Sequence, residues 1–272
     1  MIPAPFDYVR AESVEDAISK LSSTEDAKLL AGGHSLLPAM KLRIARPSTL
    51  IDIGRLRDLS YVREDGDRIA IGALTRHHDV AASEALQQGC PIVAHAAGQI
   101  GDPQVRHVGT IGGSVAHGDP AGDLPSVLLA LDAEFVATGP TGERSIDAST
   151  FFTSLFETAL EPTEVLTEIR VPRSDTGWSF MKFNRRAQDW AIVGVSAIQM
   201  NGGVHVGLTN MGLTPLRASG VEEAVGGGAD PAAAAARAAE GTAPPSDAFA
   251  SDEYRRELVK VLVRRALEEA MG

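Results

Sequence analysis

AGGHSLLPAMKLR (residues 31–43) and GTIGGSVAHGDPAGDLP (residues 109–125) are the two stretches on which the interpretation of this sequence depends. Each is expected to mark a transition from a strand into a loop, with paired glycines at 32–33 and 112–113. Because glycine has no Cβ atom, the backbone of such a turn can approach a ligand closely. Successive N–H groups in the turn then form a concavity suited to anionic oxygen. Two such loops in one chain are able to enclose a diphosphate from both sides.

Polar side chains in and after the two loops support an anion site. Ser35, Thr110 and Ser114 add hydroxyl donors, and Asp123 lies nine residues beyond Ser114. A carboxylate at that point, where a helix is expected to begin, would accept hydrogen bonds from ribose hydroxyls. Taken singly, however, a Gly-Gly turn is usually no more than a turn. Neither loop matches GxxxxGK(S/T) or GxGxxG, so the residues do not support a P-loop or a Rossmann NAD site.

The overall composition describes a globular chain with an acidic surface. Of 272 residues, 44% are hydrophobic, and the formal net charge is −11. This gives ample core for one or two domains, and it disfavours binding to nucleic acid or to anionic membranes. No stretch approaches the apolar length of a transmembrane helix, and the N-terminal residues have neither the basic region nor the apolar core of a signal peptide. We therefore expect a cytoplasmic protein.

The chain contains one cysteine, Cys90. A single cysteine excludes an intramolecular disulfide, and it excludes an iron–sulfur cluster or a thiolate zinc site held by this chain alone. No basic residue lies near Cys90 in the sequence, so we expect an inert buried thiol. No Ser–His–Asp or Cys–His arrangement stands out among the 7 His residues, so a hydrolase is not supported.

Hydrophobic periodicity and turn residues predict two α/β units in the first part of the chain. Residues 1–53 are predicted to form a β-α-β unit whose helix begins after Ser13. The unit that follows, up to residue 174, is predicted to contain hairpins, short helices, one of them capped by Thr75, and a final strand. The glycine-rich segment 105–118 shows no helical period.

After Ser174 the pattern changes. Three antiparallel strands are predicted over 178–183, 191–200 and 204–210, and helices follow them. The C-terminal hundred residues are therefore expected to form a three-stranded sheet packed on helices.

The two glycine motifs together resemble the FAD-binding medium subunit of the molybdenum hydroxylases, and within that family the carbon-monoxide dehydrogenase type. The resemblance runs over nearly the whole chain. It also includes PAPFDYVRAESVEDAI near the N-terminus, EVLTEIRVP at 164–172, KFNRRAQDWAIVGVSA at 182–197 and SDEYRRELVKVLVRRALEEA at 251–270. The pair of motifs with their spacing is specific, whereas either motif alone is not.

The resemblance implies an α+β fold with two parts. Residues 1–174 would form an FAD-binding domain of the vanillyl-oxidase (PCMH) type, made of two α/β subdomains at about 1–53 and 54–174. Residues 175–272 would form a C-terminal α+β domain of the carbon-monoxide dehydrogenase flavoprotein type.

The resemblance also implies the residues that bind non-covalent FAD. In the family, the first loop and the second loop hold the diphosphate, Asp123 matches an acid on the ribose side, and Leu166 matches an aliphatic residue beside the flavin ring. Ile100 matches an apolar contact, and Lys182 falls near a flavin-contacting lysine, although its spacing to Arg185-Arg186 differs by one residue among relatives. The residues implied are Ala31, Gly32, Gly33, His34, Ser35, Leu36, Ile100, Thr110, Ile111, Gly112, Gly113, Ser114, Asp123, Leu166 and Lys182.

Two departures from the family pattern bear on the cofactor. Many relatives have Asn where this chain has Ser114, although Ser also occurs before the same Ala-His. Some vanillyl-oxidase-type enzymes bind flavin covalently through the His of a GGH loop, with an Arg four residues before it. Here that position is Leu30, so the FAD bound near His34 is expected to be non-covalent.

Several other polar or aromatic residues allow two interpretations each. His77-His78-Asp79 would suit a metal only if adjacent rings converged, so a solvated helix N-terminus is favoured. His117 and Asp119 would either stabilise their loop or contact the flavin or a partner. Arg185-Arg186 would either act on a redox partner or be an ordinary exposed pair, and Trp190 would lie under the flavin or in the core. No catalytic residue and no metal ligand is assigned.

The function implied is that of an electron-transfer subunit. A partner large subunit would carry the molybdenum cofactor, a small subunit would carry [2Fe-2S] clusters, and the FAD of this chain would pass electrons to an external acceptor. A dimer of heterotrimers is expected. The alternatives are a subunit of a hydroxylase for purines, N-heterocycles or aldehydes, an FAD-free docking scaffold, and a stand-alone flavin oxidase.

Overall fold

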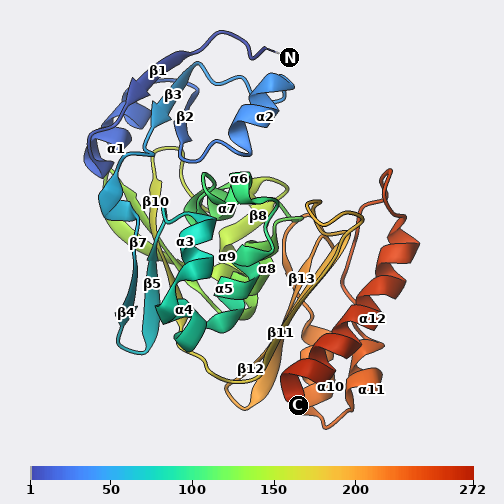
Figure 1. Ribbon diagram of the computed structural model, residues 1–272. Helices are drawn as coiled ribbons and strands as arrows, with labels where there is room; N and C mark the ends of the chain where they lie inside the picture. The colour runs from blue at the N-terminus through green and yellow to red at the C-terminus, as the bar shows by residue number, and fades with distance from the viewer. Residues whose placement is uncertain (1) are drawn as a thin grey trace.

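The computed structural model describes residues 2–272, which form three main sheets with helices between and around them (Figure 1). The first sheet is parallel, with strand order β1-β3-β2. Its elements are β1 (Asp7–Arg10), α1 (Val14–Ser23), β2 (Ala27–Leu30), α2 (Leu36–Lys41) and β3 (Thr49–Asp52). The predicted β-α-β unit and its cap are confirmed, because the Ser13 hydroxyl accepts a hydrogen bond from Asp16 N at 3.1 Å.

The second sheet is antiparallel, with strand order β4-β5-β10-β6-β7. Both predicted hairpins are confirmed, and the last of these strands along the chain, β10, is the central one. The strands are β4 (Val62–Asp65), β5 (Arg68–Gly72), β6 (Glu134–Gly139), β7 (Gly142–Asp147) and β10 (Val165–Pro172). A small hairpin of β8 (Phe152–Ser154) and β9 (Glu157–Thr158) precedes β10.

Helices connect the strands of the second sheet. They are η1 (Arg57–Leu59), α3 (His77–Ala82), α4 (Glu84–Gly89), α5 (Pro91–Gly98), α6 (Pro103–Arg106), α7 (Ile111–His117), α8 (Asp123–Ala130) and α9 (Ala148–Phe151). Thr75 does not cap α3 as predicted, because its hydroxyl bonds instead to the backbone of Tyr61, accepting from N at 3.0 Å and donating to O at 2.9 Å.

The segment 105–118 was predicted to lack a helix, and this prediction is wrong. Thr110 caps α7 through a hydrogen bond from Gly113 N at 3.2 Å. A Cβ atom on Gly112 would lie 2.5 Å from the Cβ of Ala73. The glycines therefore allow α7 to pack tightly on the segment after β5, and this tertiary contact outweighs their low helix propensity.

The third sheet has four strands rather than the three predicted. The strands are β11 (Trp178–Phe183), β12 (Val193–Met200), β13 (Gly203–Thr209) and β14 (Leu216–Arg217). The fourth strand pairs only two residues with β13, which is too short to produce an alternating pattern in the sequence. Helices α10 (Ser219–Gly226), α11 (Pro231–Ala235) and α12 (Asp252–Met271) cover one face of this sheet (Figure 1).

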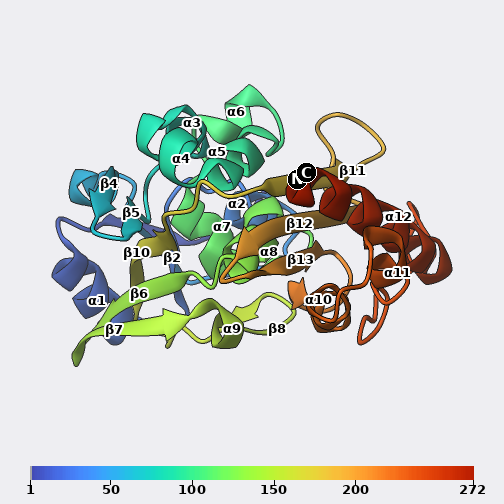
Figure 2. The same ribbon diagram turned by 90° about the horizontal axis from the view of Figure 1, so that it is seen from below.

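Helix α8 joins the second and third sheets. In two views it lies between β10 and the strands β12 and β13 (Figures 1 and 2), and every residue from Asp123 to Ala130 is buried. Ser126 Oγ hydrogen-bonds Thr209 Oγ1 of β13 at 2.5 Å. Gly207 passes so close that a Cβ atom there would lie 2.2 Å from Ser126 O. None of the helices within residues 2–272 is both long and apolar enough to cross a membrane.

Replacing Gly207 by Ala tests this packing. The added methyl group would overlap the Ser126 carbonyl, which is backbone and cannot rotate away, so we expect a loss of about 1–3 kcal/mol in the free energy of unfolding. Urea unfolding followed by circular dichroism measures it. Gly226→Ala is the control, since a Cβ atom at that helical glycine meets no atom within 4 Å, and its effect should lie between neutral and about 1 kcal/mol stabilising. Equal stability of the two variants would contradict the packing described.

Candidate functional site

The two glycine loops are in direct contact. A Cβ atom on Gly32 would lie 2.3 Å from Val108 O and 2.8 Å from Gly109 Cα. A Cβ atom on Gly113 would lie 4.0 Å from the Cβ of Ala31. The expectation that the loops come together is therefore confirmed, and we call this contact the loop junction.

The first loop offers a row of free backbone donors. Within residues 2–272, the N–H groups of Gly32, Gly33, His34 and Ser35 donate to no other backbone group, and the Ser35 side chain does not cap α2. Gly33 adopts a left-handed conformation with φ of +72°, which glycine accommodates without strain. Successive free N–H groups around such a residue make an anion-binding concavity.

The second loop differs from this expectation, because the N–H groups around its paired glycines are used by the protein. Ile111 N donates to Thr75 O at 3.0 Å, and Gly112 N donates to Ala73 O at 2.9 Å. Gly113 N donates to the Thr110 hydroxyl. The second loop therefore contributes close approach and the hydroxyl groups of Thr110 and Ser114, whereas the first loop contributes the N–H groups.

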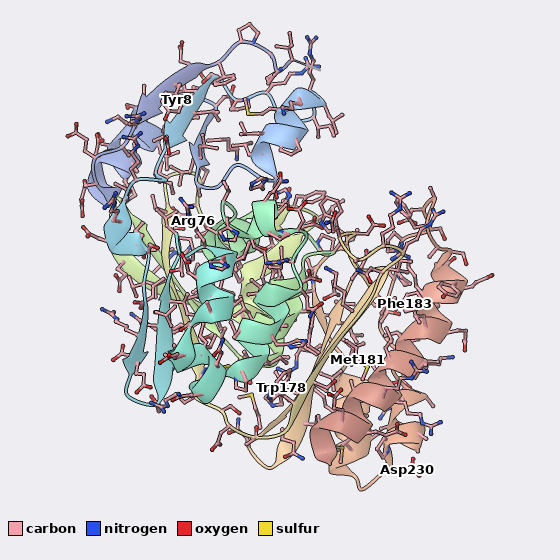
Figure 3. All side chains as sticks on the ribbon, in the orientation of Figure 1. Tyr8, Arg76, Trp178, Met181, Phe183 and Asp230 are labelled. Carbon is pink, nitrogen blue, oxygen red and sulfur yellow. The ribbon has the colours of Figure 1, made fainter. Side chains whose placement is uncertain are left out.

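A buried ion pair lies where α8 meets the third sheet. Alternate residues of β11 point to opposite faces: Trp178 and Phe180 pack on the core of the second sheet, whereas Met181 packs on the core beneath α12 (Figure 3). Lys182 shares the face of Phe180, and its Nζ donates to Asp123 Oδ2 at 2.7 Å and to Gln99 O at 3.0 Å. The two side chains are only 6% and 7% exposed.

The hydrogen bonding of this ion pair is incomplete. Asp123 Oδ1 is buried and has no hydrogen-bond partner within the described residues. Burial raises the pKa of Asp123 to about 6, and the Lys182 ammonium only partly opposes that shift. Lys182 Nζ has three donors and uses two of them. The pair therefore keeps one acceptor and one donor for a ligand.

The remaining predicted residues lie in two places. Ile100 directly follows Gln99, whose carbonyl accepts from Lys182, and is half-buried against the core of the second sheet. Leu166 is buried within β10, with 6% of its surface exposed. The structure thus forms two groups of predicted residues. The first group is the two loops, and the second is Asp123, Lys182 and the segment before Ile100. Helix α7 and the turn after it connect the two groups.

The predicted solvated helix N-terminus at His77-His78-Asp79 is confirmed for the exposed His78 and Asp79 and is wrong for His77. Its side chain is 4% exposed beneath the second loop, where a Cβ atom on Gly109 would lie 3.0 Å from its ring. Among residues 2–272, its Nδ1 finds no hydrogen-bond partner. Burial, and to a lesser extent His34 and Arg106, lowers its pKa to about 4. Gly109 is the one sequence signal for this ring, because a Cβ atom there would crowd it.

The other ambiguous residues are resolved in part. Asp119 stabilises its own loop by accepting from Ala121 N at 2.9 Å, and the His117 ring packs 5.0 Å from that of Phe156. Trp190 is 69% exposed, which excludes the core interpretation. Cys90 is buried, as expected, and burial raises the pKa of its thiol to about 12. Residues 2–272 contain no group of three or more His, Cys, Asp or Glu arranged to hold a metal.

Comparisons with known proteins cover the whole chain. Residues 4–174 match the family model of the FAD binding domain in molybdopterin dehydrogenase, and residues 178–270 match that of the CO dehydrogenase flavoprotein C-terminal domain. The carbon monoxide dehydrogenase medium chain of Hydrogenophaga pseudoflava is 42% identical over 99% of this chain and 98% of its own length. The nicotine 6-hydroxylase medium subunit of Paenarthrobacter nicotinovorans is 35% identical over 97% and 96%.

Solved structures are similar over the same extent. The carbon monoxide dehydrogenase from H. pseudoflava that lacks the Mo-pyranopterin moiety matches with a TM-score of 0.94 and 42% identity, over 100% of this chain and 99% of the matched chain. Quinoline 2-oxidoreductase from Pseudomonas putida 86 matches with a TM-score of 0.93 and 28% identity, over 100% and 99%.

The buried imidazole predicts a pH dependence of stability. The pKa of His77 is about 4 in the folded chain, against 6.5 for a free imidazole, so the unfolded chain binds more protons between these values and acidification favours unfolding. Going from pH 8 to pH 5 should cost about 2 kcal/mol through this group. His77→Gln should remove that loss, whereas His78→Gln, at the exposed neighbour, should keep it. Urea unfolding at both pH values measures it, and an identical pH response of the two variants would refute the assignment.

The buried ion pair predicts strong coupling between its members. Lys182→Met or Asp123→Asn alone leaves one charge buried without its partner and should cost about 3–5 kcal/mol at pH 7. The double variant removes both charges and should recover most of that loss, with a coupling energy above about 1 kcal/mol. Urea unfolding of the four proteins gives this energy.

Acid provides the control for that cycle. The raised pKa of Asp123 means that the folded chain binds more protons than the unfolded chain between pH 4 and 6, so this carboxyl favours the folded state most at low pH. The loss caused by Lys182→Met should therefore shrink at pH 5. Additive single effects, or a loss that grows on acidification, would contradict the coupling.

Proposed function

This chain belongs to the family of FAD-binding medium subunits of the molybdenum hydroxylases, and from that membership we propose that it holds FAD and relays electrons in a complex of the carbon-monoxide dehydrogenase type. The observation that carries the proposal is the loop junction with its row of free N–H groups from Gly32 to Ser35. A diphosphate needs donors in close succession and a backbone without obstructing side chains. The residues present fit that requirement.

The proposed cofactor site joins both groups of residues. The first loop would bind the diphosphate through backbone N–H groups, and the hydroxyls of Thr110 and Ser114 would complete it from the second loop. Asp123 would accept a hydroxyl hydrogen bond through its unpartnered Oδ1. The full proposed set is Ala31, Gly32, Gly33, His34, Ser35, Leu36, Ile100, Thr110, Ile111, Gly112, Gly113, Ser114, Asp123, Leu166 and Lys182.

When bound, FAD supplies one- and two-electron exchange, which is chemistry of the cofactor itself. The chain's own residues bind and orient. Lys182, held by Asp123 and Gln99 O, would direct its third donor and its positive charge at the bound group, which favours negative charge there. Outer-sphere electron exchange needs no side-chain acid or base, so no catalytic residue is proposed.

The partners follow from the family. We propose a large subunit that carries the molybdenum cofactor and a small subunit that carries [2Fe-2S] clusters, assembled as a dimer of heterotrimers in the cytoplasm. Residues 1–174 would form the FAD-binding domain, with subdomains at about 1–53 and 54–174, and residues 175–272 the C-terminal domain. The single cysteine, buried with a raised thiol pKa, offers this chain no means of holding a cluster by itself.

The substrate of the complex is proposed to be carbon monoxide, because two relatives named carbon monoxide dehydrogenase medium chain are 42% and 40% identical over 99% of this chain. An N-heterocycle is the second candidate. It is favoured by the relatives named nicotine 6-hydroxylase medium subunit and caffeine dehydrogenase subunit beta, at 35% and 32% identity.

Flavin release tests the proposed function. Acid precipitation of the purified chain should release one flavin per chain, whose fluorescence rises after phosphodiesterase treatment because FAD, unlike FMN, is internally quenched. A chain that remains flavin-free after incubation with FAD would support the scaffold alternative. Oxidation of an organic donor by the isolated chain, without a molybdenum partner, would support the stand-alone oxidase.

Variants of the first loop sharpen that test. Gly32→Ala would force the loops apart, because its Cβ atom would overlap Val108 O, and should weaken FAD binding at least about tenfold. Ser35→Ala removes a hydroxyl that makes no cap in the protein, so it should weaken FAD binding severalfold without changing stability. Gly226→Ala is the control. Fluorescence titration of the apo-proteins measures the dissociation constants, and wild-type affinity in both loop variants would refute the assigned site.

A further inference from the structure

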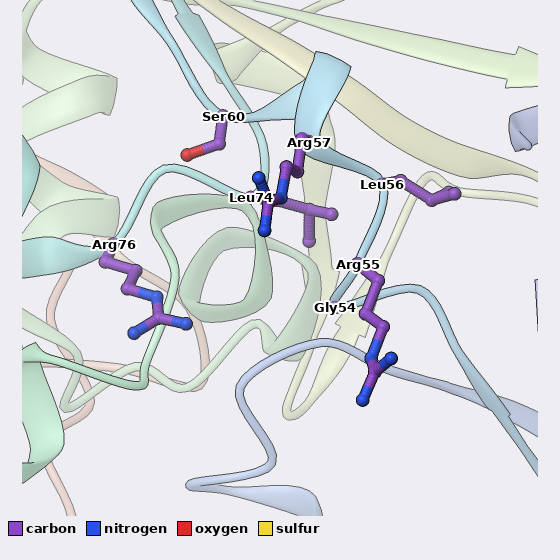
Figure 4. A pocket seen from close by; sticks show the side chains of 7 residues that line it. All are labelled: Gly54, Arg55, Leu56, Arg57, Ser60, Leu74 and Arg76. Atoms are coloured by element: carbon purple, nitrogen blue, oxygen red, sulfur yellow. The ribbon is translucent and has the colours of Figure 1, made fainter.

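Three arginines line a pocket of about 490 Å³ outside the residues assigned to FAD above (Figure 4). We call it the arginine pocket. Its lining is Gly54, Arg55, Leu56, Arg57, Ser60, Leu74 and Arg76. Arg55 and Arg57 come from the segment that leaves the first sheet, and Arg76 comes from the residues just before α3.

The three guanidinium groups lack counter-charges. Within residues 2–272, none of the three forms an ion pair with a carboxylate, although nine other arginines do so. Arg76 is held in place because its Nη1 donates to His107 O at 2.6 Å. Three positive charges around one pocket repel each other. In a chain of net charge −11, this leaves a concentrated positive site whose complement is an external anion.

The chemistry of the lining favours phosphate on an organic body. Planar guanidinium forks match the oxygens of phosphate groups in pairs. A volume of about 490 Å³ lies within the range of pockets for small organic ligands. Leu56 and Leu74 offer apolar surface, and the Ser60 hydroxyl offers a polar contact for the remainder of such a molecule.

The pocket adjoins the beginnings of both glycine loops. A Cβ atom on Gly54, at one rim, would lie 3.3 Å from Ala31 O. Arg76, at the other rim, forms a β-bridge with Thr110. Because β2 and β3 are parallel neighbours, their carboxyl ends place Ala31 and Gly54 side by side. The positive site is therefore contiguous with the loop junction.

We propose that the arginine pocket binds the phosphate groups of a nucleoside diphosphate. The ligand has two possible sources. One is the chain's own FAD, whose single diphosphate would be bound by the first loop on one side and by the arginine pocket on the other, in which case the inference rests on the proposed function. The other is a separate nucleotide that binds beside bound FAD. In either case, Arg55 and Arg57 supply positive charge to the phosphate groups, whereas the backbone N–H groups of the first loop carry no net charge.

The test uses the full chain and ADP as the probe. Arg55→Ala/Arg57→Ala removes two charges from the pocket and leaves the Arg76 contact to the second loop intact. Arg264→Ala/Arg265→Ala on α12 is the control, since it removes the same charge from an exposed helix face. Calorimetry measures ADP binding to FAD-loaded and FAD-free protein at two salt concentrations, and fluorescence titration measures FAD binding. Melting temperatures verify that both variants fold.

We expect the pocket variant, but not the control, to weaken nucleotide binding about tenfold or more and to reduce its dependence on salt. ADP binding to FAD-loaded wild type, lost in the pocket variant, identifies a separate nucleotide. ADP that competes with FAD, with weaker FAD binding in the pocket variant, identifies the diphosphate of the chain's own FAD. Equal FAD and ADP affinities in the two variants would overturn the inference. If the chain binds ADP through these arginines but takes up no FAD, the proposed function fails while the inference stands.

Discussion

The contact between the Gly32 backbone and the Val108 carbonyl is the constraint on which the rest of the site depends. No side chain other than glycine's hydrogen fits a space in which a Cβ atom would lie 2.3 Å from a carbonyl oxygen. This contact sets the first loop against the second, and so sets the first sheet against the helices of the second. It also fixes the place of the free N–H row. A cofactor bound there would contact both the first loop and the second loop. Its affinity would therefore depend on how these two loops are placed relative to each other.

The distribution of charge also favours an anionic ligand at this place. The chain is acidic as a whole, with a net charge of −11, yet positive groups are concentrated where an anionic ligand is expected. Lys182 reaches from the third sheet to Asp123 at the start of α8. Beside the loop junction lie three arginines that pair with no carboxylate in the described part of the chain. On a negative surface, a local positive site attracts anions to that one place. The buried Lys182–Asp123 pair also connects the C-terminal sheet to α8, because burying either charge without its partner would destabilise the fold.

The fold and the site differ in how far local sequence predicts them. Turn residues, caps and periodicity, all of which act within a few residues, predict the two hairpins of the second sheet and the β-α-β unit. They do not predict the helix α7, the strand β14 or the burial of His77. The glycines of α7 disfavour a helix locally, but Gly112 is needed there because Ala73 occupies the space that a side chain would take. Strand β14 has two residues, and the burial of His77 involves a close contact with Gly109, which is far from it in the sequence.

By itself, the sequence determined the β-α-β unit, the hairpins, the two loops and the family to which the chain belongs, because these depend on residue types and spacings that are read directly. Only the tertiary structure decided that the N–H groups of the first loop stay free while those of Ile111–Gly113 are used by the protein. It also decided that Lys182 meets Asp123 and that Arg55, Arg57 and Arg76 surround one pocket. The physical reason is that a hydrogen bond or a charge cluster depends on distances through space. Residues 59 positions apart in the chain, such as Asp123 and Lys182, carry no local sign that they will meet.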